Sequence, residues 1–76
     1  MATVGRSRRL THEDAVLIVR RVLEGESQHT VAAAFGVNQG RVSEIVNGRR
    51  YPGAIEEALR RWPHLRDAAE RRRRRG

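Results

Sequence analysis

The stretch that decides the fold runs from Thr30 to Asn47, TVAAAFGVNQGRVSEIVN. It begins with a short apolar segment, reaches Gly36, and continues with a segment whose apolar residues lie on one side. Gly36 can adopt the positive φ that often ends a helix, and Asn38 is a favourable N-cap for a following helix. The apolar residues after the turn recur at helical spacing: Val42, Ile45 and Val46. The stretch therefore predicts two short helices joined by a tight turn, over about 28–35 and 39–47.

Further helix signals flank this pair. Thr11 can cap a first helix that has acidic residues in its first turn, where they favour the helix dipole. Gly25 ends this helix, and Ser27 can cap the next one. The first helix has an apolar stripe at helical spacing: Ala15, Val19, Val22 and Leu23. A fourth helix is expected over about 54–62, with an apolar stripe of three residues: Ile55, Leu59 and Trp62.

These elements predict an all-α fold, a compact helix-turn-helix bundle of four to five helices. With 76 residues, of which 38% are hydrophobic, the chain can build one small domain. Pro63 either ends the fourth helix or opens a fifth segment. We expect a flexible basic arm over 1–9, the domain over 10–65, and an arginine-rich tail over 66–76. The five arginines at 71–75 repel one another, so this end is expected to be disordered when unbound.

The positive charge lies at the two ends of the chain. All 16 basic residues are arginine, against nine acidic residues, which gives a net charge of +7. Residues 1–10 carry +3, residues 11–48 carry −2 and residues 49–76 carry +6. The planar guanidinium of arginine matches phosphate oxygens and base edges. A general bias toward arginine would explain the missing lysine, but it would not explain the clustering at both ends.

Several classes of function lack the residues that they need. There is no cysteine, and the histidines lie far apart, so we expect neither a metal site nor a cofactor. The sequence has no paired catalytic carboxylates, no nucleophile–base pair and no phosphate-binding loop, so we expect neither an enzyme nor a small-molecule substrate. It also lacks a membrane-spanning apolar run and the apolar core of a signal peptide. We therefore expect a cytoplasmic, nucleoid-associated protein.

The segment from Gln28 to Asn47 resembles the DNA-binding helix-turn-helix. In that family a small residue lies where the second helix crosses the first closely, here Ala32, and a glycine lies in the turn, here Gly36. The apolar positions of the family pattern are Val31, Phe35, Val37, Val42 and Ile45. A wider resemblance, over roughly Leu10 to Tyr51, is to regulators of phages and mobile elements and to homing-type nucleases. It implies that the first helix supports the second, which lies in the major groove.

The resemblance implies that Gln39, Ser43 and Asn47 read bases, and Asn or Gln can pair with adenine through two hydrogen bonds. Asn47 could instead serve only to end its helix. Arg41 is a candidate for a guanine or phosphate contact. Glu44 either reads a cytosine or pairs with Arg41 three residues before it. The ion pair is favoured, because a carboxylate that faces phosphates is unfavourable.

Other residues around the second helix are candidates for the DNA backbone. Gly40 either has no significance near the helix start or allows the nucleic acid to approach closely, and the second interpretation is favoured. Ser27 and Asn38 would offer backbone amides to phosphate at helix N-termini. The three residues after the helix are expected to bind phosphates of the DNA backbone: Arg49, Arg50 and Tyr51. They lie within four residues of Asn47. The alternative is a solvated charged turn with Tyr51 packed inward.

The ends of the chain would add affinity. Arg6, Arg8 and Arg9 could enter a minor groove, as N-terminal arms do in related helix-turn-helix folds. The tail could bind DNA, RNA or any acidic partner.

These features predict a sequence-specific, double-stranded DNA-binding regulator of transcription, of phage or mobile-element type. One motif of this size contacts only a few base pairs, so a homodimer or a cooperative assembly is expected. The stripe of the fourth helix could form the dimer face, or close the monomer's own core, which is the favoured use of its tryptophan. Two alternatives remain: a nonspecific architectural or RNA-binding protein, and an adaptor that docks on another protein.

Overall fold

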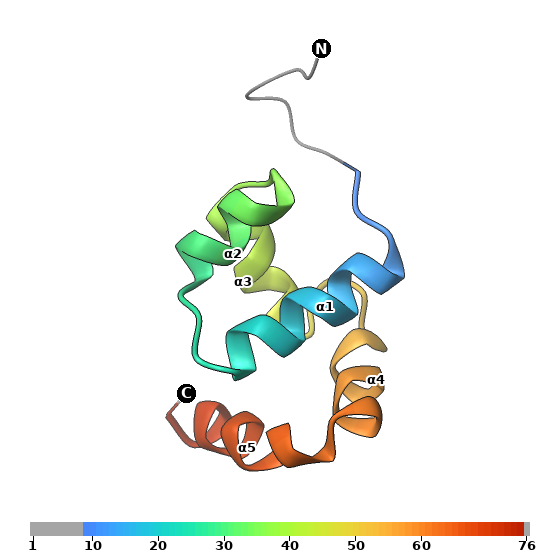
Figure 1. The fold of residues 1–76 in the computed structure, drawn as a ribbon, viewed down its shortest axis with the longest axis vertical. Helices are drawn as coiled ribbons and strands as arrows, with labels where there is room; N and C mark the ends of the chain where they lie inside the picture. The colour runs from blue at the N-terminus through green and yellow to red at the C-terminus, as the bar shows by residue number, and fades with distance from the viewer. Residues whose placement is uncertain (1–8, 76) are drawn as a thin grey trace.

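A computed structural model of the chain describes residues 9–75. In chain order it contains α1 (His12–Leu23), α2 (Gln28–Phe35), α3 (Gln39–Val46), α4 (Ala54–Arg61), the 3-10 turn η1 (Pro63–Leu65) and α5 (Arg66–Arg75). No strand occurs within this part, so the prediction of an all-α bundle is confirmed. α1 runs through the middle of the molecule, with α2 and α3 on one side of it and α4 and α5 on the other (Figure 1).

α1 is the helix around which the others pack, since it contacts α2, α3 and α4. It begins at the predicted cap: Thr11 Oγ1 accepts a hydrogen bond from the Asp14 amide at 3.1 Å, and the Asp14 carboxylate accepts one from the Thr11 amide at 3.0 Å. Val16 and Ile18, which lie outside the expected apolar stripe, are fully buried. Neighbours on several sides therefore bury more of the circumference of α1 than a single stripe.

The core consists of aliphatic side chains. The largest fully buried ones come from α1, α2 and α3: Val16, Ile18, Val19, Val31, Val42 and Ile45. Burial of one such side chain contributes about 1.5–3 kcal/mol. The aromatic residues Phe35, Tyr51 and Trp62 are half-buried at the edge of this core. Within residues 9–75, no buried polar side-chain atom lacks a hydrogen-bond partner.

The turn between α2 and α3 has the predicted construction. Gly36 ends α2 in the left-handed region, with φ 70° and ψ 30°. The Val37 amide donates to the Ala32 carbonyl at 3.0 Å, which satisfies a carbonyl at the end of α2. Val37 is 9% exposed and Ala32 is 3% exposed, so both sides of the turn are anchored in the core. The start of α3 is therefore held in a defined position relative to α2.

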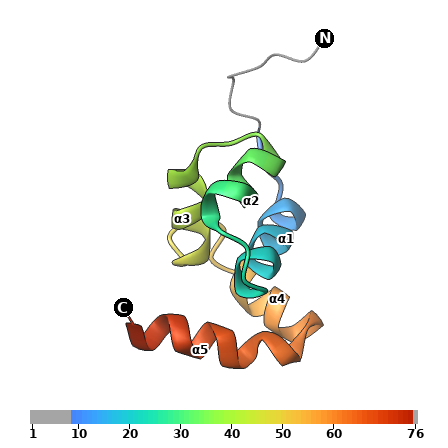
Figure 2. The ribbon, with the colours of Figure 1, turned by 60° about the vertical axis from the view of Figure 1, so that its left-hand side comes forward.

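The C-terminal end differs from the prediction. Pro63 opens η1, Leu65 is buried, and α5 then continues to Arg75, where disorder was expected over 71–75. Arginine has a high helix propensity, and positive side chains near a helix C-terminus interact favourably with its dipole. These effects oppose the repulsion among the arginines. The main contacts of α5 are with η1, and Figure 2 shows α5 running along one end of the body.

Candidate nucleic-acid interface

α3 buries one side and presents the other to solvent. Val42 and Ile45 are fully buried, and Val46 is 9% exposed. The six residues of α3 and its C-cap that are candidates for contact with DNA are exposed or half-buried: Gln39, Gly40, Arg41, Ser43, Glu44 and Asn47. The Nδ2 of Asn47 donates to the Ser43 Oγ at 3.3 Å, so these two side chains lie together. These six residues therefore lie on α3 or at its C-cap, and the apolar side of the helix is packed against the core.

The start of α3 is tightly built. Asn38 Oδ1 accepts a hydrogen bond from the Arg41 amide at 2.9 Å, as predicted for an N-cap. A helix leaves its other first-turn amides without intrahelical partners, here those of Gln39 and Gly40. A Cβ atom added at Gly40 would lie 3.3 Å from Asn38 Oδ1, closer than an ordinary contact. Gly40 therefore also keeps room for the cap.

Three arginines surround the single carboxylate of this surface. Glu44 Oε1 accepts a hydrogen bond from Arg50 Nε at 2.8 Å, so the expected pairing with Arg41 is wrong. The amides of Arg49 and Arg50 both donate to the Glu44 carbonyl, which folds the chain back onto the end of α3. The hydrogen bond from Arg50 lowers the pKa of Glu44, and the charges of Arg50, Arg41 and Arg49 lower it further. Glu44 stays ionised and restrains Arg50.

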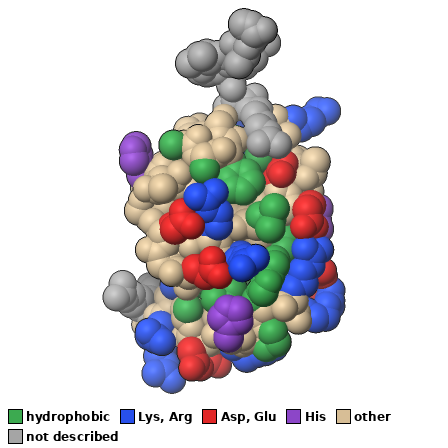
Figure 3. All heavy atoms as spheres, in the orientation of Figure 1, with side chains coloured by type: hydrophobic (Ala, Val, Ile, Leu, Met, Phe, Trp, Pro, Cys, Tyr) green, Lys and Arg blue, Asp and Glu red, His purple; other side chains and the backbone are tan. Residues whose placement is uncertain are grey.

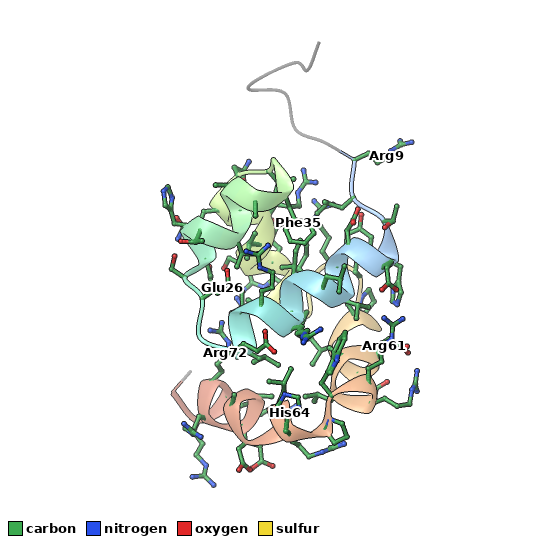
Figure 4. All side chains as sticks on the ribbon, viewed as in Figure 1. Arg9, Glu26, Phe35, Arg61, His64 and Arg72 are labelled. Atoms are coloured by element: carbon green, nitrogen blue, oxygen red, sulfur yellow. The ribbon has the colours of Figure 1, made fainter. Side chains whose placement is uncertain are left out.

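Tyr51 packs inward, in agreement with the alternative considered for it. Its ring is half-buried against the core, and its hydroxyl donates to the Leu10 carbonyl at 2.7 Å. Its φ of 54° lies in the left-handed region, which is uncommon for a residue other than glycine. Tyr51 thereby joins the segment after α3 to Leu10, the residue before the N-cap of α1. Arg9 is exposed at that point and directed away from the body (Figure 4), whereas Arg6 and Arg8 lie outside the described residues.

The arginines of α1 and α4 are paired with acidic residues. The ion pairs are Arg20–Glu24, Arg21–Glu26, Arg60–Glu57, Arg61–Glu57 and Arg61–Glu13. Positive and negative side chains accordingly lie next to one another on the face seen in Figure 3. In contrast, the side chains of Arg41 and Arg49 form no hydrogen bond or ion pair within residues 9–75. Among the arginines from α1 to α4, those without an ion pair therefore lie on α3 and directly after it.

Ser27 is the predicted cap of α2. Its Oγ accepts from the Thr30 amide at 3.0 Å and donates to Thr30 Oγ1 at 2.8 Å. It precedes α2, whereas the other candidate phosphate-binding residues flank α3. The sequence did not predict two contacts of this region, the Tyr51–Leu10 hydrogen bond and the Glu44–Arg50 ion pair. Neither contact joins residues three or four positions apart on one helix.

Within residues 9–75, no group of three or more His, Cys, Asp or Glu side chains is placed to hold a metal ion, and no helix could cross a membrane. Comparison with protein families, with curated proteins and with solved structures finds no match to this chain.

Proposed function

We propose that this protein binds double-stranded DNA in a sequence-specific manner through α3 and acts as a regulator of transcription. The observation that carries the proposal is the division of α3 into a buried aliphatic side and an outer side whose polar groups are open to a ligand. The major groove of B-DNA is wide enough to admit such a helix. A protein of this kind would work in the cytoplasm, at the nucleoid.

Within this proposal, α3 divides its contacts between bases and phosphates. Gln39, at the exposed start of the helix, would read a base, and Ser43 and Asn47 would act together because they are already hydrogen-bonded. Arg41 and Arg49 would contact phosphate or guanine, since neither is neutralised by a partner within residues 9–75. Phosphate contacts fix position and register, whereas base contacts give specificity.

The direct test is selection of bound duplexes from a random pool at moderate salt. An enriched sequence motif would support the proposal. A pool that is retained without enrichment would refute specific reading, and would favour a nonspecific basic protein whose affinity depends steeply on salt.

The two kinds of contact can be separated by single substitutions. We expect Gln39→Ala to change the preferred base at one position of the selected site, because it removes a group that can make two hydrogen bonds to adenine. Arg49→Ala should weaken all duplexes alike and reduce the slope of log affinity against log salt by about 1. Binding titrations on the selected site and on its single-base variants measure both effects. If both substitutions lower affinity equally for every sequence, α3 does not read bases.

One copy of α3 covers only a few base pairs, so two copies are proposed to bind repeated half-sites. Trp62 does not offer a free dimer face, since it packs on the core beneath the Arg20 guanidinium, 4.5 Å from the ring centre. Analytical ultracentrifugation with and without DNA tests this part. A single copy on the selected site would overturn it and leave the binding proposal intact.

A further inference from the structure

A groove of about 310 Å³ lies between α5 and the body of the domain. Its lining comes from four helices, α1, α3, α4 and α5, and from the end of α3 at Asn47. The apolar side chains that the body contributes are Val19, Leu23, Val46, Ile55 and Leu59. Of these, Leu23, Ile55 and Leu59 are only half-buried, so apolar surface remains open in the groove.

α5 lines this groove without filling it. Arg66, Ala69, Glu70 and Arg73 lie on one face of α5, because their spacing is i, i+3, i+4 and i+7, and all four line the groove. Ala69 is the only apolar residue among them, and it offers a single methyl group. The main contacts of α5 are with η1 and not with α1 or α4. An apolar side chain from another molecule could therefore enter the groove.

The rim of the groove is strongly positive. Arg66, Arg72 and Arg73 line it against one acidic residue, Glu70. Figure 4 shows the Arg72 side chain directed from α5 toward the end of α1. None of these three arginines forms an ion pair within residues 9–75, unlike the arginines of α1 and α4. The groove thus joins an apolar floor to unneutralised guanidinium groups.

We propose that this groove binds an acidic amphipathic helix of a partner protein. Apolar side chains on one face of that helix would fill the space above Leu59 and Ile55, as in helix-in-groove recognition. Aspartate or glutamate residues beside that face would pair with Arg72 and Arg73, since arginine and carboxylate form charge-assisted, often bidentate hydrogen bonds. This surface is separate from the outer side of α3, and the two meet only at Asn47.

Charge and chemistry favour this occupant over two others. A second copy of the chain carries +7 and would bring further arginines against the same rim. Nucleic acid would satisfy the arginines but has no aliphatic side chains for the floor. An acidic amphipathic helix matches both parts of the groove.

The probe is a synthetic peptide of about four helical turns, with leucines at i, i+3 and i+7 and glutamates on the flanks. Fluorescence anisotropy with the full chain, in the absence of DNA, measures its binding. A control peptide has the same composition, but its leucines are distributed around the helix. We expect the control peptide to bind at least about tenfold more weakly, because its distributed leucines cannot fill the groove. Equal binding of the two peptides would overturn the proposal.

Two sets of variants locate the peptide. Leu59→Gln should weaken binding about tenfold, whereas Leu17→Gln, at a half-buried leucine outside the groove, should not. The double variant Arg72→Gln/Arg73→Gln should also weaken binding. Its control, Arg71→Gln/Arg74→Gln, makes the same charge change on the same helix away from the groove lining. Circular dichroism verifies that each variant folds. If Leu59→Gln unfolds, the comparison of the two double arginine variants still locates the bound peptide.

Three further results would contradict the proposal. The peptide could fail to bind, or the two double arginine variants could weaken it equally. The Arg72→Gln/Arg73→Gln variant could also lose affinity for DNA while the peptide fails to bind, which would make α5 a nucleic-acid contact. Because the assay contains no DNA, peptide binding neither requires nor excludes the proposed reading by α3.

Discussion

At the scale of single residues, Glu44 is the most informative side chain of the proposed interface. It is a carboxylate on a surface that would face phosphates, and it is held by the Nε of Arg50. Both partners are nearly half exposed, so the pair contributes little to stability. Its main effect is on the local charge, because it neutralises Arg50, one of the three arginines on α3 or directly after it.

We expect Glu44→Gln to strengthen binding to all duplexes up to about fivefold, because it frees Arg50 and removes a repulsive charge. The matched control is Glu24→Gln, which makes the same change in the Arg20–Glu24 pair of α1. Binding titrations at fixed salt compare the two. Equal strengthening by both variants would mean that only net charge matters, and a changed base preference would instead identify Glu44 as a cytosine reader.

At the scale of elements, the α2–α3 pair depends on a small residue beneath the turn. Ala32 is 3% exposed, and the Val37 amide donates to its carbonyl. Ala33, the next residue of α2, is exposed. The same helix therefore holds two adjacent alanines in opposite environments.

We expect Ala32→Leu to lower the free energy of unfolding by about 1–3 kcal/mol, because a larger side chain overpacks the core and shifts α3 from its base. Ala33→Leu should change it by less than about 0.5 kcal/mol. Denaturant unfolding measures both, and DNA affinity should fall only for Ala32→Leu. A core that accepts leucine at residue 32 with no loss of stability would show that α2 and α3 are not closely packed there.

At the scale of the whole molecule, Arg61 connects the start of α1 to α4. Its Nη1 and Nη2 donate to the Glu13 carboxylate at 2.8 and 2.9 Å, and its Nε donates to Glu57 at 2.8 Å. These hydrogen bonds lower the pKa of Glu13 and of Glu57. Arg20 adds a second link, since it lies over the ring of Trp62 at the end of α4. Both interactions link α4 to α1.

Acid should weaken this connection. A carboxylate whose pKa is lowered by folding stabilises the protein above its ordinary pKa, about 4.3, and this stabilisation is lost as pH falls through the lowered pKa. We therefore expect the melting temperature to fall as the pH drops below about 4.3. Arg61→Gln should flatten this dependence but not remove it, because Glu26 and Glu44 also have lowered pKa values. A variant whose melting temperature falls as steeply as that of the unchanged protein would contradict this assignment.

The helix boundaries could be predicted because they depend on local chemistry. Thr11, Ser27 and Asn38 each accept a hydrogen bond from an amide three residues later, and Gly36 takes the left-handed conformation. The local sequence did not predict the C-terminal helix, because two local effects oppose each other there. In the tail, repulsion among arginines predicted disorder, but helix propensity and the dipole favour α5.

The sequence by itself determined the all-α class, the caps and the polar outer side of α3, since each depends on residues within one or two helical turns. The tertiary structure alone decided which long-range partners those residues acquire. It buried Val16 and Ile18, joined Tyr51 to Leu10, and set α5 beside an incompletely filled groove. Such contacts depend on how separate helices pack in space, and helical periodicity carries no information about that packing.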